Sequence, residues 1–568
     1  MTRPHFRFWP RRLPTHITAP QTSLWFNLEV SARRYPDKDA IVFYGRHVRY
    51  RELHDDALAV AGWLQQVAGV GKGDRVLLYM QNCPQFVAAY YGILRADAVV
   101  VPVNPMNRPE EFKHYITDAG ASVVICSDDL AANVTAANAD LPEAQRVRHL
   151  LAASYADALP ATCDHPEDAP PAWLTAAHPP QPGAVAWTDA LAQRRVPGPH
   201  TAGPDDLAVM PYTSGTTGLP KGCMHPHRTV MHNIVGGALW SQATMEGVSL
   251  SIIPLFHVTG MQYGMNTPIY MGSTVVMLPR WDREVAGRLI SRYKVTHWTN
   301  IPTMVIDFLA SPQLAAFDLS SLVYIGGGGA AMPQAVAERL HKAFNLLYQE
   351  GYGLSETIAP THSNPADRPK LQCLGMPVFN TDARVIDPQT LQELPPGEVG
   401  EIIVNGPQVF LGYWGKPQAT AEAFIEFEGK RFFRTGDLGR MDEEGYFFLT
   451  DRLKRMINAS GFKVWPAEVE SLMYKHPDIQ EACIIGTHDA YRGESVKAVV
   501  VLMAHARGKV TEEDIIGWAR DHMAAYKYPR VVEFVDALPK SGTGKVMWRT
   551  LQEQENARNA AAEKPAAA

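Results

Sequence analysis

The sequence predicts an α/β protein with a large N-terminal domain of parallel and mixed sheets, a β-rich subdomain within it and a small α+β C-terminal domain. Strand-like apolar runs alternate with helical segments in the first 130 residues, which is typical of a mainly parallel sheet covered on both faces. Short strands and turns dominate residues 372–450. A short charged joint at 452–455 then precedes a compact C-terminal segment.

The N-terminal alternation rests on the spacing of apolar residues. Residues 50–67 carry them at helical spacing, and a helix is also expected over 84–95. Residues 153–206 contain ten prolines and are predicted to be an irregular surface segment. Short apolar runs between turn residues predict the following strands: 40–44, 74–80, 99–102, 122–125, 207–210, 249–254, 274–278, 295–299 and 321–325.

Composition restricts the class of protein. The chain has 568 residues, of which 46% are hydrophobic and 20% charged, as in an ordinary globular protein. A net charge of −6 provides no general attraction to nucleic acid, so no nucleic-acid partner is expected. Six scattered cysteines without paired metal spacing fit a reduced, cytoplasmic protein. No apolar run approaches the length of a membrane-spanning helix.

The two ends of the chain are predicted to lie outside the domains. Residues 1–22 form an N-terminal extension, because prolines interrupt the amphipathic helix that an Arg-rich targeting peptide would need. Weak contact of this basic start with a membrane surface stays open. Residues 554–568, which end in alanines, are predicted to be a disordered tail.

The clearest chemical signal is the glycine- and hydroxyl-rich stretch 212–222. Backbone N–H groups in such a turn bind anions, and Lys221 adds a cation. The spacing differs from the Walker loop, because Pro220 stands where that motif needs glycine. A flexible linker is the alternative interpretation. The predicted phosphate-binding residues are Thr213, Ser214, Gly215, Thr216, Thr217, Gly218 and Lys221.

A second glycine-rich strand end follows at residues 326–333, before a helix that begins near Pro333. This arrangement indicates close approach of a ligand to the backbone. The segment 350–357, Glu-Gly-Tyr-Gly-Leu-Ser-Glu-Thr, comes next.

Five motifs occur in one order: the phosphate loop, 352–356, Arg-Thr-Gly-Asp at 434–437, Asp-Arg-Leu-Lys at 451–454 and Pro-Lys-Ser-Gly-Thr-Gly-Lys at 539–545. Together they resemble the AMP-forming acyl-CoA synthetases of the adenylate-forming superfamily, over roughly residues 23–553. The stretch 460–470 is most similar to bacterial medium- and long-chain fatty acid ligases. The resemblance implies two half-reactions. A carboxylate attacks the α-phosphate of ATP to give an acyl-adenylate and pyrophosphate, and coenzyme A then displaces AMP.

The resemblance assigns residues to ATP and to the metal. Ser214 to Gly218 would wrap the β- and γ-phosphates, with Lys221 neutralising them. Mg²⁺ would lie between phosphate oxygens with Glu356 and Thr216 as protein ligands. Lys545 would bridge the substrate carboxylate and the α-phosphate. Without the resemblance, an exposed lysine or a lone glutamate is more often simply solvated.

The nucleoside is assigned in the same way. Tyr352 would face the adenine ring, Asp437 would accept hydrogen bonds from the ribose hydroxyls, and Arg452 would contact ribose or phosphate. An aromatic core residue and a turn aspartate are the alternatives for the first two. The remaining backbone contacts are expected from Gly328, Gly329, Ala330, Gly351, Gly353 and Ser355.

The resemblance also implies that the C-terminal domain, residues 455–553, is mobile relative to the AMP-binding domain, residues 23–452. The hinge would lie at 453–454, with Lys454 at the hinge position. Gly461 and Phe462 would line the pantetheine path. His257 would gate the acyl pocket or position the carboxylate; a core histidine is the alternative. The expected acyl pocket is mostly large and apolar: Trp240, Val258, Met261, Tyr263, Pro302, Thr303 and Met332.

Three functions are compared. The first is ATP-dependent activation of a fatty acid and its transfer to coenzyme A. The second is the same chemistry on an arylic or other carboxylic acid, which is weakened because Asn458 stands where many arylic members carry lysine. The third is an inactive nucleotide-binding scaffold, and the intact Lys221, Glu356 and Lys545 count against it. A homodimer and the acyl chain length stay open.

Overall fold

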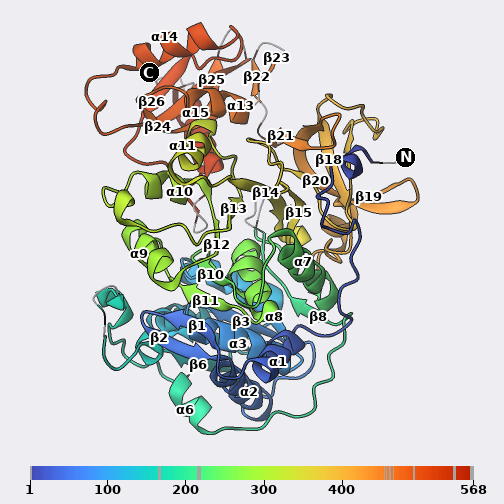
Figure 1. The fold of residues 1–568 in the computed structure, drawn as a ribbon, viewed down its shortest axis with the longest axis vertical. Helices are drawn as coiled ribbons and strands as arrows, with labels where there is room; N and C mark the ends of the chain where they lie inside the picture. Colours follow the sequence, from blue (N-terminus) through green and yellow to red (C-terminus); the bar gives the residue numbers. More distant parts are fainter. Residues whose placement is uncertain are drawn as a thin grey trace, which may run out of the picture.

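The computed structural model describes residues 3–163, 165, 168–213, 219–452, 455, 457–459, 462–464, 466–489, 493–541 and 545–562. Two large sheets with their helices form the lower part of the molecule in Figure 1. The β-rich subdomain lies at the upper right, and the C-terminal domain lies above the rest. Short 3-10 turns are found at Pro4–Arg7, Asp128–Leu130, Glu143–Gln145, Tyr155–Ala158, Ala172–Leu174, Leu314–Ala316 and Ser355–Thr357.

The first large sheet carries the base of the predicted phosphate loop. Its described strands run in the order β7-β6-β5-β3-β4-β8-β9 and are parallel except for the β8–β9 pair. Its strands are β3 (Arg75–Tyr79), β4 (Val99–Pro102), β5 (Val123–Ser127), β6 (His149–Ala153), β7 (Ala184–Ala186), β8 (Leu207–Val209) and β9 (His225–Pro226). The helices between these strands are α3 (Pro84–Arg95), α4 (Pro109–Ala119), α5 (Ala131–Ala139) and α6 (Trp187–Ala192).

The second large sheet has the order β16-β15-β14-β13-β12-β10-β11-β1-β2 among the described residues. Its middle strands are parallel, so their C-terminal ends meet at one edge, which is where ligands bind in open α/β sheets. Its strands are β1 (Asp39–Phe43), β2 (Arg46–Arg49), β10 (Val248–Ser251), β11 (Thr274–Met277), β12 (His297–Asn300), β13 (Tyr324–Gly328), β14 (Gln349–Leu354), β15 (Ala359–Ser363) and β16 (Met376–Pro377).

The helices around this sheet include an unusual π-helical turn, η7 (Gly260–Asn266), which runs directly into α8 (Thr267–Met271). Such turns are rare and are often found at functional sites. The other helices here are α1 (Trp25–Arg34), α2 (Tyr50–Gln66), α7 (His227–Trp240), α9 (Arg283–Tyr293), α10 (Pro302–Leu309) and α11 (Gln334–Phe344).

The β-rich subdomain is an antiparallel sheet, as the short strands and turns indicate. It consists of β17 (Asp382–Ile386), β18 (Gly400–Asn405), β19 (Phe424–Phe427), β20 (Lys430–Met441), β21 (Phe447–Arg452) and α12 (Pro417–Glu422). The C-terminal domain contains β22 (Ile457–Ala459), β23 (Phe462–Val464), β24 (Ile479–Asp489), β25 (Gly493–Leu502), β26 (Val531–Phe534), α13 (Pro466–Met473), α14 (Glu512–His522) and α15 (Trp548–Ala562).

The N-terminal extension is part of the packed structure. The Trp9 ring makes edge contacts with Trp240 and Phe379, at centroid distances of 5.3 and 5.7 Å. Its indole N–H donates to the carbonyls of Leu13 and Pro14. Prolines prevent a regular helix over most of this segment, but they do not prevent an extended chain from packing against a surface. In Figure 1 the segment runs along the β-rich subdomain.

The prediction of a disordered tail from residue 554 is wrong as far as Ala562, because α15 continues to that residue. Glu555 anchors the helix, being 6% exposed. Its carboxylate accepts hydrogen bonds from the Thr487 hydroxyl and from the Lys497 ammonium, both at 2.6 Å. Alanine, glutamine and glutamate are good helix formers, so the composition that indicated disorder also suits a docked helix.

Two other predictions are corrected. The segment 153–206, predicted to be irregular, contains β7 and α6, and its Asp168 is buried against Arg292 at 2.5 Å. The strand predicted at 321–325 is shifted to Tyr324–Gly328, so three glycines lie inside the ladder. Neighbouring backbones on both sides hold this glycine run extended despite its low strand propensity.

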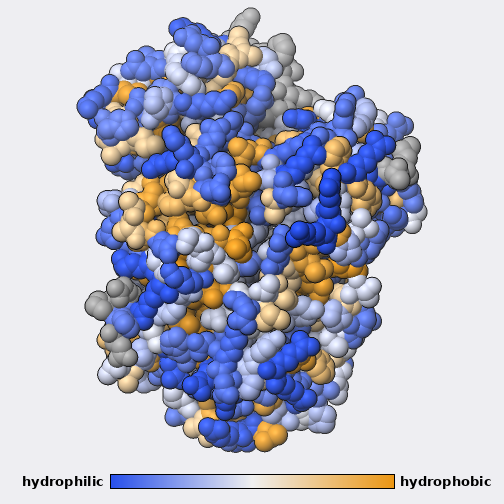
Figure 2. Space-filling model, in the orientation of Figure 1, coloured by the Kyte–Doolittle hydropathy of each residue, from blue (hydrophilic) through white to orange (hydrophobic). Residues whose placement is uncertain are grey.

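The space-filling view shows hydrophobic residues gathered just below the C-terminal domain, over α10, while much of the lower surface is hydrophilic (Figure 2). Within the described part of the chain, no helix combines the length and apolar character needed to cross a membrane.

Candidate functional site

The glycine-rich ends of β13 and β14 form one wall of the site. Gly328 pairs with Gly351 across the two strands. A β-carbon on Gly328 would lie 2.3 Å from the Gly351 carbonyl oxygen, so residue 328 must be glycine. The chain then turns outward at Gly329, which has a φ of +91°, and Ala330 is exposed. This wall presents bare backbone at the sheet edge.

Tyr352 and Asp437 meet at this wall. The Tyr352 hydroxyl donates to the Asp437 carboxylate at 2.6 Å, joining β14 of the large sheet to β20 of the subdomain. Asp437 is 2% exposed, and its strand partner on β21 is Arg452. The structure therefore brings together the side chains of Tyr352 and Asp437, two of the residues that the resemblance assigned to the nucleoside, and pairs the backbone of Arg452 with that of Asp437.

A second cluster joins the base of the phosphate loop to Glu356. The Tyr413 hydroxyl donates to Glu356 Oε1 at 2.8 Å, and Lys221 Nζ lies 4.2 Å from the centre of the Tyr413 ring. Burial, with the nearby Glu356 charge, raises the pKa of Tyr413. Tyr413 therefore stays a hydrogen-bond donor that orients the carboxylate. Sequence reasoning missed Tyr413, because it belongs to none of the motifs.

The ends of the phosphate loop are tied together. Tyr212 and Gly222 form an antiparallel bridge, and the Thr213 N–H donates to the Lys221 carbonyl at 3.0 Å. These two contacts hold the ends of the loop together and fix the position of the Lys221 backbone. Ser214, Gly215, Thr216, Thr217 and Gly218 lie outside the described residues.

Lys545 of the C-terminal domain reaches the glycine wall. Its Cε lies 2.9 Å, and its Nζ 3.6 Å, from the position that a β-carbon on Gly329 would occupy. A second contact between the domains is the hydrogen bond from Gln372 Nε2 to Ser471 Oγ, at 2.8 Å. The C-terminal domain is thus docked with Lys545 at the edge of the sheet.

His257 lies close enough to Lys545 to respond to its charge. Burial lowers the pKa of His257 to about 3, with a smaller contribution from the Lys545 ammonium. The Thr259 N–H donates to Nδ1 at 3.4 Å, which assigns the ring proton to Nε2. His257 is therefore a neutral imidazole near pH 7 that presents a donor rather than a positive charge.

Glu350 is a buried carboxylate behind the glycine wall. It is 4% exposed and accepts hydrogen bonds from the N–H groups of Met332, at 2.6 Å, and Cys373, at 3.1 Å. Burial raises the pKa of this carboxyl to about 7. Glu350 ties the loop after Gly329 to the segment that carries Gln372. Its position directly before the Gly-Tyr-Gly segment, 351–353, was the sequence signal that could have identified it.

Other predicted residues are placed as follows. The Ser355 carbonyl accepts from His225 at 2.7 Å, and Gly353 pairs with Pro360 in the adjoining strand. Phe462 lies on β23, whereas Lys454 and Gly461 lie outside the described residues. Of the expected acyl pocket, Tyr263 and Trp240 line cavities, whereas Val258, Met261 and Met332 are core residues. No cluster of three or more metal-binding side chains is found among the described residues.

Comparisons with known proteins agree with this geometry. Residues 28–414 match the family model of the AMP-binding enzyme, and residues 468–545 match the AMP-binding enzyme C-terminal domain. The chain belongs to the AMP-binding enzyme family.

Relatives of this AMP-binding enzyme are matched over nearly their whole length. A long-chain-fatty-acid–CoA ligase of Bacillus subtilis (strain 168) is 37% identical, covering 97% of this chain and 98% of the relative. A feruloyl-CoA synthase of an Amycolatopsis species is 33% identical, covering 91% of this chain and 96% of the relative. The structure of ATP-bound MatB from Rhodopseudomonas palustris has a TM-score of 0.81 at 30% identity, covering 94% and 99%. The prediction of an AMP-forming acid–thiol ligase that activates a fatty acid is confirmed.

Proposed function

We propose that this ligase works in two half-reactions that share the glycine wall. In the first, a fatty acid carboxylate attacks the α-phosphate of ATP and pyrophosphate leaves. In the second, the thiol of coenzyme A attacks the acyl-adenylate and AMP leaves. The observation that carries the proposal is Lys545, placed beside Gly329 by a domain that follows the rest of the site in the sequence.

The first half-reaction brings an anion to a polyanion, so positive charge is needed where negative charge accumulates. Lys545 supplies it between the substrate carboxylate and the α-phosphate. Lys221 holds the phosphates that leave, at the tied base of the loop that includes Ser214 to Gly218. Neutral His257 donates from Nε2 toward the carboxylate without adding a charge that would compete with Lys545.

The nucleoside is held by the Tyr352–Asp437 pair. Asp437 accepts from the ribose hydroxyls, and Arg452 contacts ribose or phosphate from the adjacent strand. The Tyr352 ring covers one face of the adenine, and the backbone at Gly328 to Ala330 covers the other. The 2.6 Å hydrogen bond fixes both groups before ATP binds.

Mg²⁺ is assigned to Glu356 and Thr216. A carboxylate is a ligand of the kind that Mg²⁺ prefers, and the Tyr413 hydroxyl orients it. Because no protein cage is found among the described residues, the ion would be shared with phosphate oxygens and water. When bound, it would neutralise phosphate charge.

The second half-reaction needs Lys545 to leave and the thiol path to open. We assign the hinge to residues 453–454, with Lys454 absorbing the change in backbone angles, and the pantetheine path to Gly461 and Phe462. The Gln372–Ser471 hydrogen bond belongs to the docked arrangement and would break when the C-terminal domain turns.

The test is pyrophosphate release with a panel of straight-chain acids from four to eighteen carbons, with benzoates as the arylic comparison. Release that depends on a fatty acid, followed by thioester formation with coenzyme A, is expected. Release with benzoates but with no fatty acid would favour the arylic alternative. Absence of acid-dependent release would contradict the proposal and favour a scaffold.

A further inference from the structure

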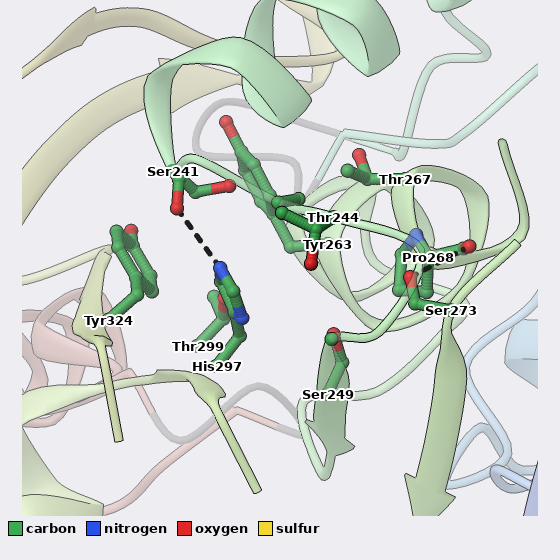
Figure 3. Close-up of a pocket in the computed structure, with 12 residues that line it drawn as sticks. Ser241, Thr244, Ser249, Tyr263, Thr267, Pro268, Ser273, His297, Thr299 and Tyr324 are labelled. Atoms are coloured by element: carbon green, nitrogen blue, oxygen red, sulfur yellow. Dashed lines mark hydrogen bonds between the residues drawn. The ribbon is translucent and has the colours of Figure 1, made fainter. Parts of the chain in front are cut away.

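A cavity lies against the face of the second large sheet, below the glycine wall. It is lined by residues of β10, β12 and β13, of η7 and α8, and of the turn that follows α7 (Figure 3). This inner cavity has a volume of about 20 Å³, room for about one water molecule. It shares Ser241, His297 and Tyr324 with an outer cavity of about 360 Å³, which Trp240 also lines.

The inner cavity is lined mainly by polar side chains. Nine of its twelve lining residues carry a hydroxyl, a phenol or an imidazole, and no aliphatic side chain larger than alanine or proline lines it. An apolar lining is the rule for a site that binds a hydrocarbon tail. This cavity therefore lacks the apolar lining that was expected of the acyl pocket.

The register of the strands places the cavity on the path that an acyl chain would follow from the glycine wall, where its carboxylate would be activated. Ser249, His297 and Tyr324 form one row across β10, β12 and β13. The Tyr324 hydroxyl lies 2.9 Å from the position of a β-carbon on Gly326, so this side chain points along the sheet toward Gly329. From Gly326 to Gly329 the strand advances ~10 Å. An extended hydrocarbon with bonds of ~1.5 Å covers that distance in roughly eight carbons.

Several of these polar groups have no protein partner. Thr267 is 4% exposed, and its hydroxyl makes no hydrogen bond in the described part of the chain. Tyr263 and Tyr324 are partly buried, and no hydrogen bond of either phenol hydroxyl is found within the part of the chain that the structure describes. Burial raises the pKa of Tyr324 to about 12, so the phenol remains a donor near neutral pH. In contrast, Ser273 donates to the Pro268 carbonyl at 3.0 Å.

Such hydroxyls distinguish between two kinds of acyl end. A methyl group at the end of the chain would displace water from these hydroxyls without forming a hydrogen bond in its place. An oxygen atom at the same position would form that hydrogen bond. A site of this kind rejects the analogue that lacks the hydrogen-bonding group more strongly than an apolar pocket rejects a change of one methylene.

We propose that the inner cavity, around Tyr263, Thr267 and Tyr324, is a subsite for an oxygen-bearing group at the distal end of the acyl substrate. The inference rests on the proposed function and narrows its substrate class. The preferred acid has a hydroxyl or keto group roughly eight to twelve carbons from its carboxylate, by the strand spacing above. A hydroxyaryl acid offers the same chemistry on a rigid frame.

The test compares matched acids that differ only in the distal oxygen. kcat/KM for pyrophosphate release is measured for octanoate, decanoate and dodecanoate and for their ω-hydroxy forms. Cinnamate and 4-hydroxycinnamate form the aryl pair. At one chain length, we expect kcat/KM to be about tenfold or more higher for the hydroxy acid than for the unsubstituted acid. This is the effect expected when one buried hydroxyl gains a hydrogen-bond partner. Equal or higher kcat/KM for every unsubstituted acid would overturn the inference.

Two variants connect the preference to the cavity. Tyr324→Phe and Thr267→Val each remove one hydroxyl, and each should reduce the ratio of kcat/KM for the hydroxy acid to kcat/KM for the unsubstituted acid. Tyr293→Phe is the matched control, because the Tyr293 hydroxyl is bonded to Asp168 and Tyr293 lines neither cavity. An unchanged ratio in both cavity variants would contradict the subsite.

The outcomes separate this inference from the function on which it rests. Release with plain fatty acids alone would overturn the subsite and keep the ligase. Preference confined to 4-hydroxycinnamate would support the oxygen subsite and count against a fatty acid substrate. No release with any acid would overturn both.

Discussion

Replacing Gly329 with alanine should separate the two half-reactions. The added methyl would lie 2.9 Å from Cε of Lys545. Lysine is flexible, so the Lys545 side chain would move before the backbone of β13 does. In the proposed mechanism the thioester half-reaction takes place with the C-terminal domain turned away, so the methyl would not obstruct it.

The size of the effect follows from the contact. Carbon atoms settle at ~3.5–4.0 Å, so Cε must retreat by roughly 0.6–1.1 Å. A displacement of about 1 Å at a reacting centre costs up to ~100-fold in rate. We therefore expect acyl-adenylate formation to fall about 10- to 100-fold. The φ of +91° at Gly329 adds backbone strain of ~1–3 kcal/mol to the folded state.

Gly397→Ala is the matched control. Gly397 has a φ of +94°, and a β-carbon there would meet no atom within 4 Å. Both variants should lose similar stability in urea unfolding, but only Gly329→Ala should lose single-turnover formation of acyl-adenylate. Equal adenylation rates in the two variants, or equal loss in both half-reactions of Gly329→Ala, would refute the placement of Lys545.

Three further predictions follow from buried contacts. Burial raises the pKa of Glu350 from 4.5 to about 7, so protonation of this carboxyl favours the folded state. The free energy of unfolding should therefore fall by up to ~3 kcal/mol as pH rises from 4.5 through 7. Glu350→Gln should flatten that decline, as measured by urea titrations at a series of pH values. Parallel profiles would contradict this. Tyr413→Phe removes the hydrogen bond to Glu356 and should raise the KM for Mg-ATP by up to about tenfold, with an unchanged KM counting against the orienting role. Trp9→Ala should cost ~3–5 kcal/mol, measured as a lower unfolding midpoint; a midpoint equal to wild type would mean that the extension is not packed in solution.

The large features of the fold could be predicted because they depend on local pattern. Helix α3 begins at a proline, and its predicted bounds, 84–95, agree with the structure. Strand β13 was displaced by three residues, because its glycines are held extended by neighbours distant in the sequence. Helix α15 was missed for the same reason, since Glu555 is anchored by β24 and β25.

The candidate site, too, was predicted only in part. Motifs identified Tyr352, Asp437 and Lys545, and the structure places each of them at the glycine wall. Glu350 and Tyr413 act through side chains that meet only after the subdomain packs on the sheet, so no local pattern indicated their partners. The polar cavity depends on the register of three strands, which is not a property of any single segment.

The role of Lys545 is tested most directly by measuring the two half-reactions separately in Lys545→Ala. The account predicts a loss of about 100-fold or more in acyl-adenylate formation from ATP and acid, as expected when a positioned cation is removed from the transition state. Thioester formation from supplied acyl-adenylate and coenzyme A should be retained. Equal loss in both half-reactions, or an undiminished first half-reaction, would contradict it.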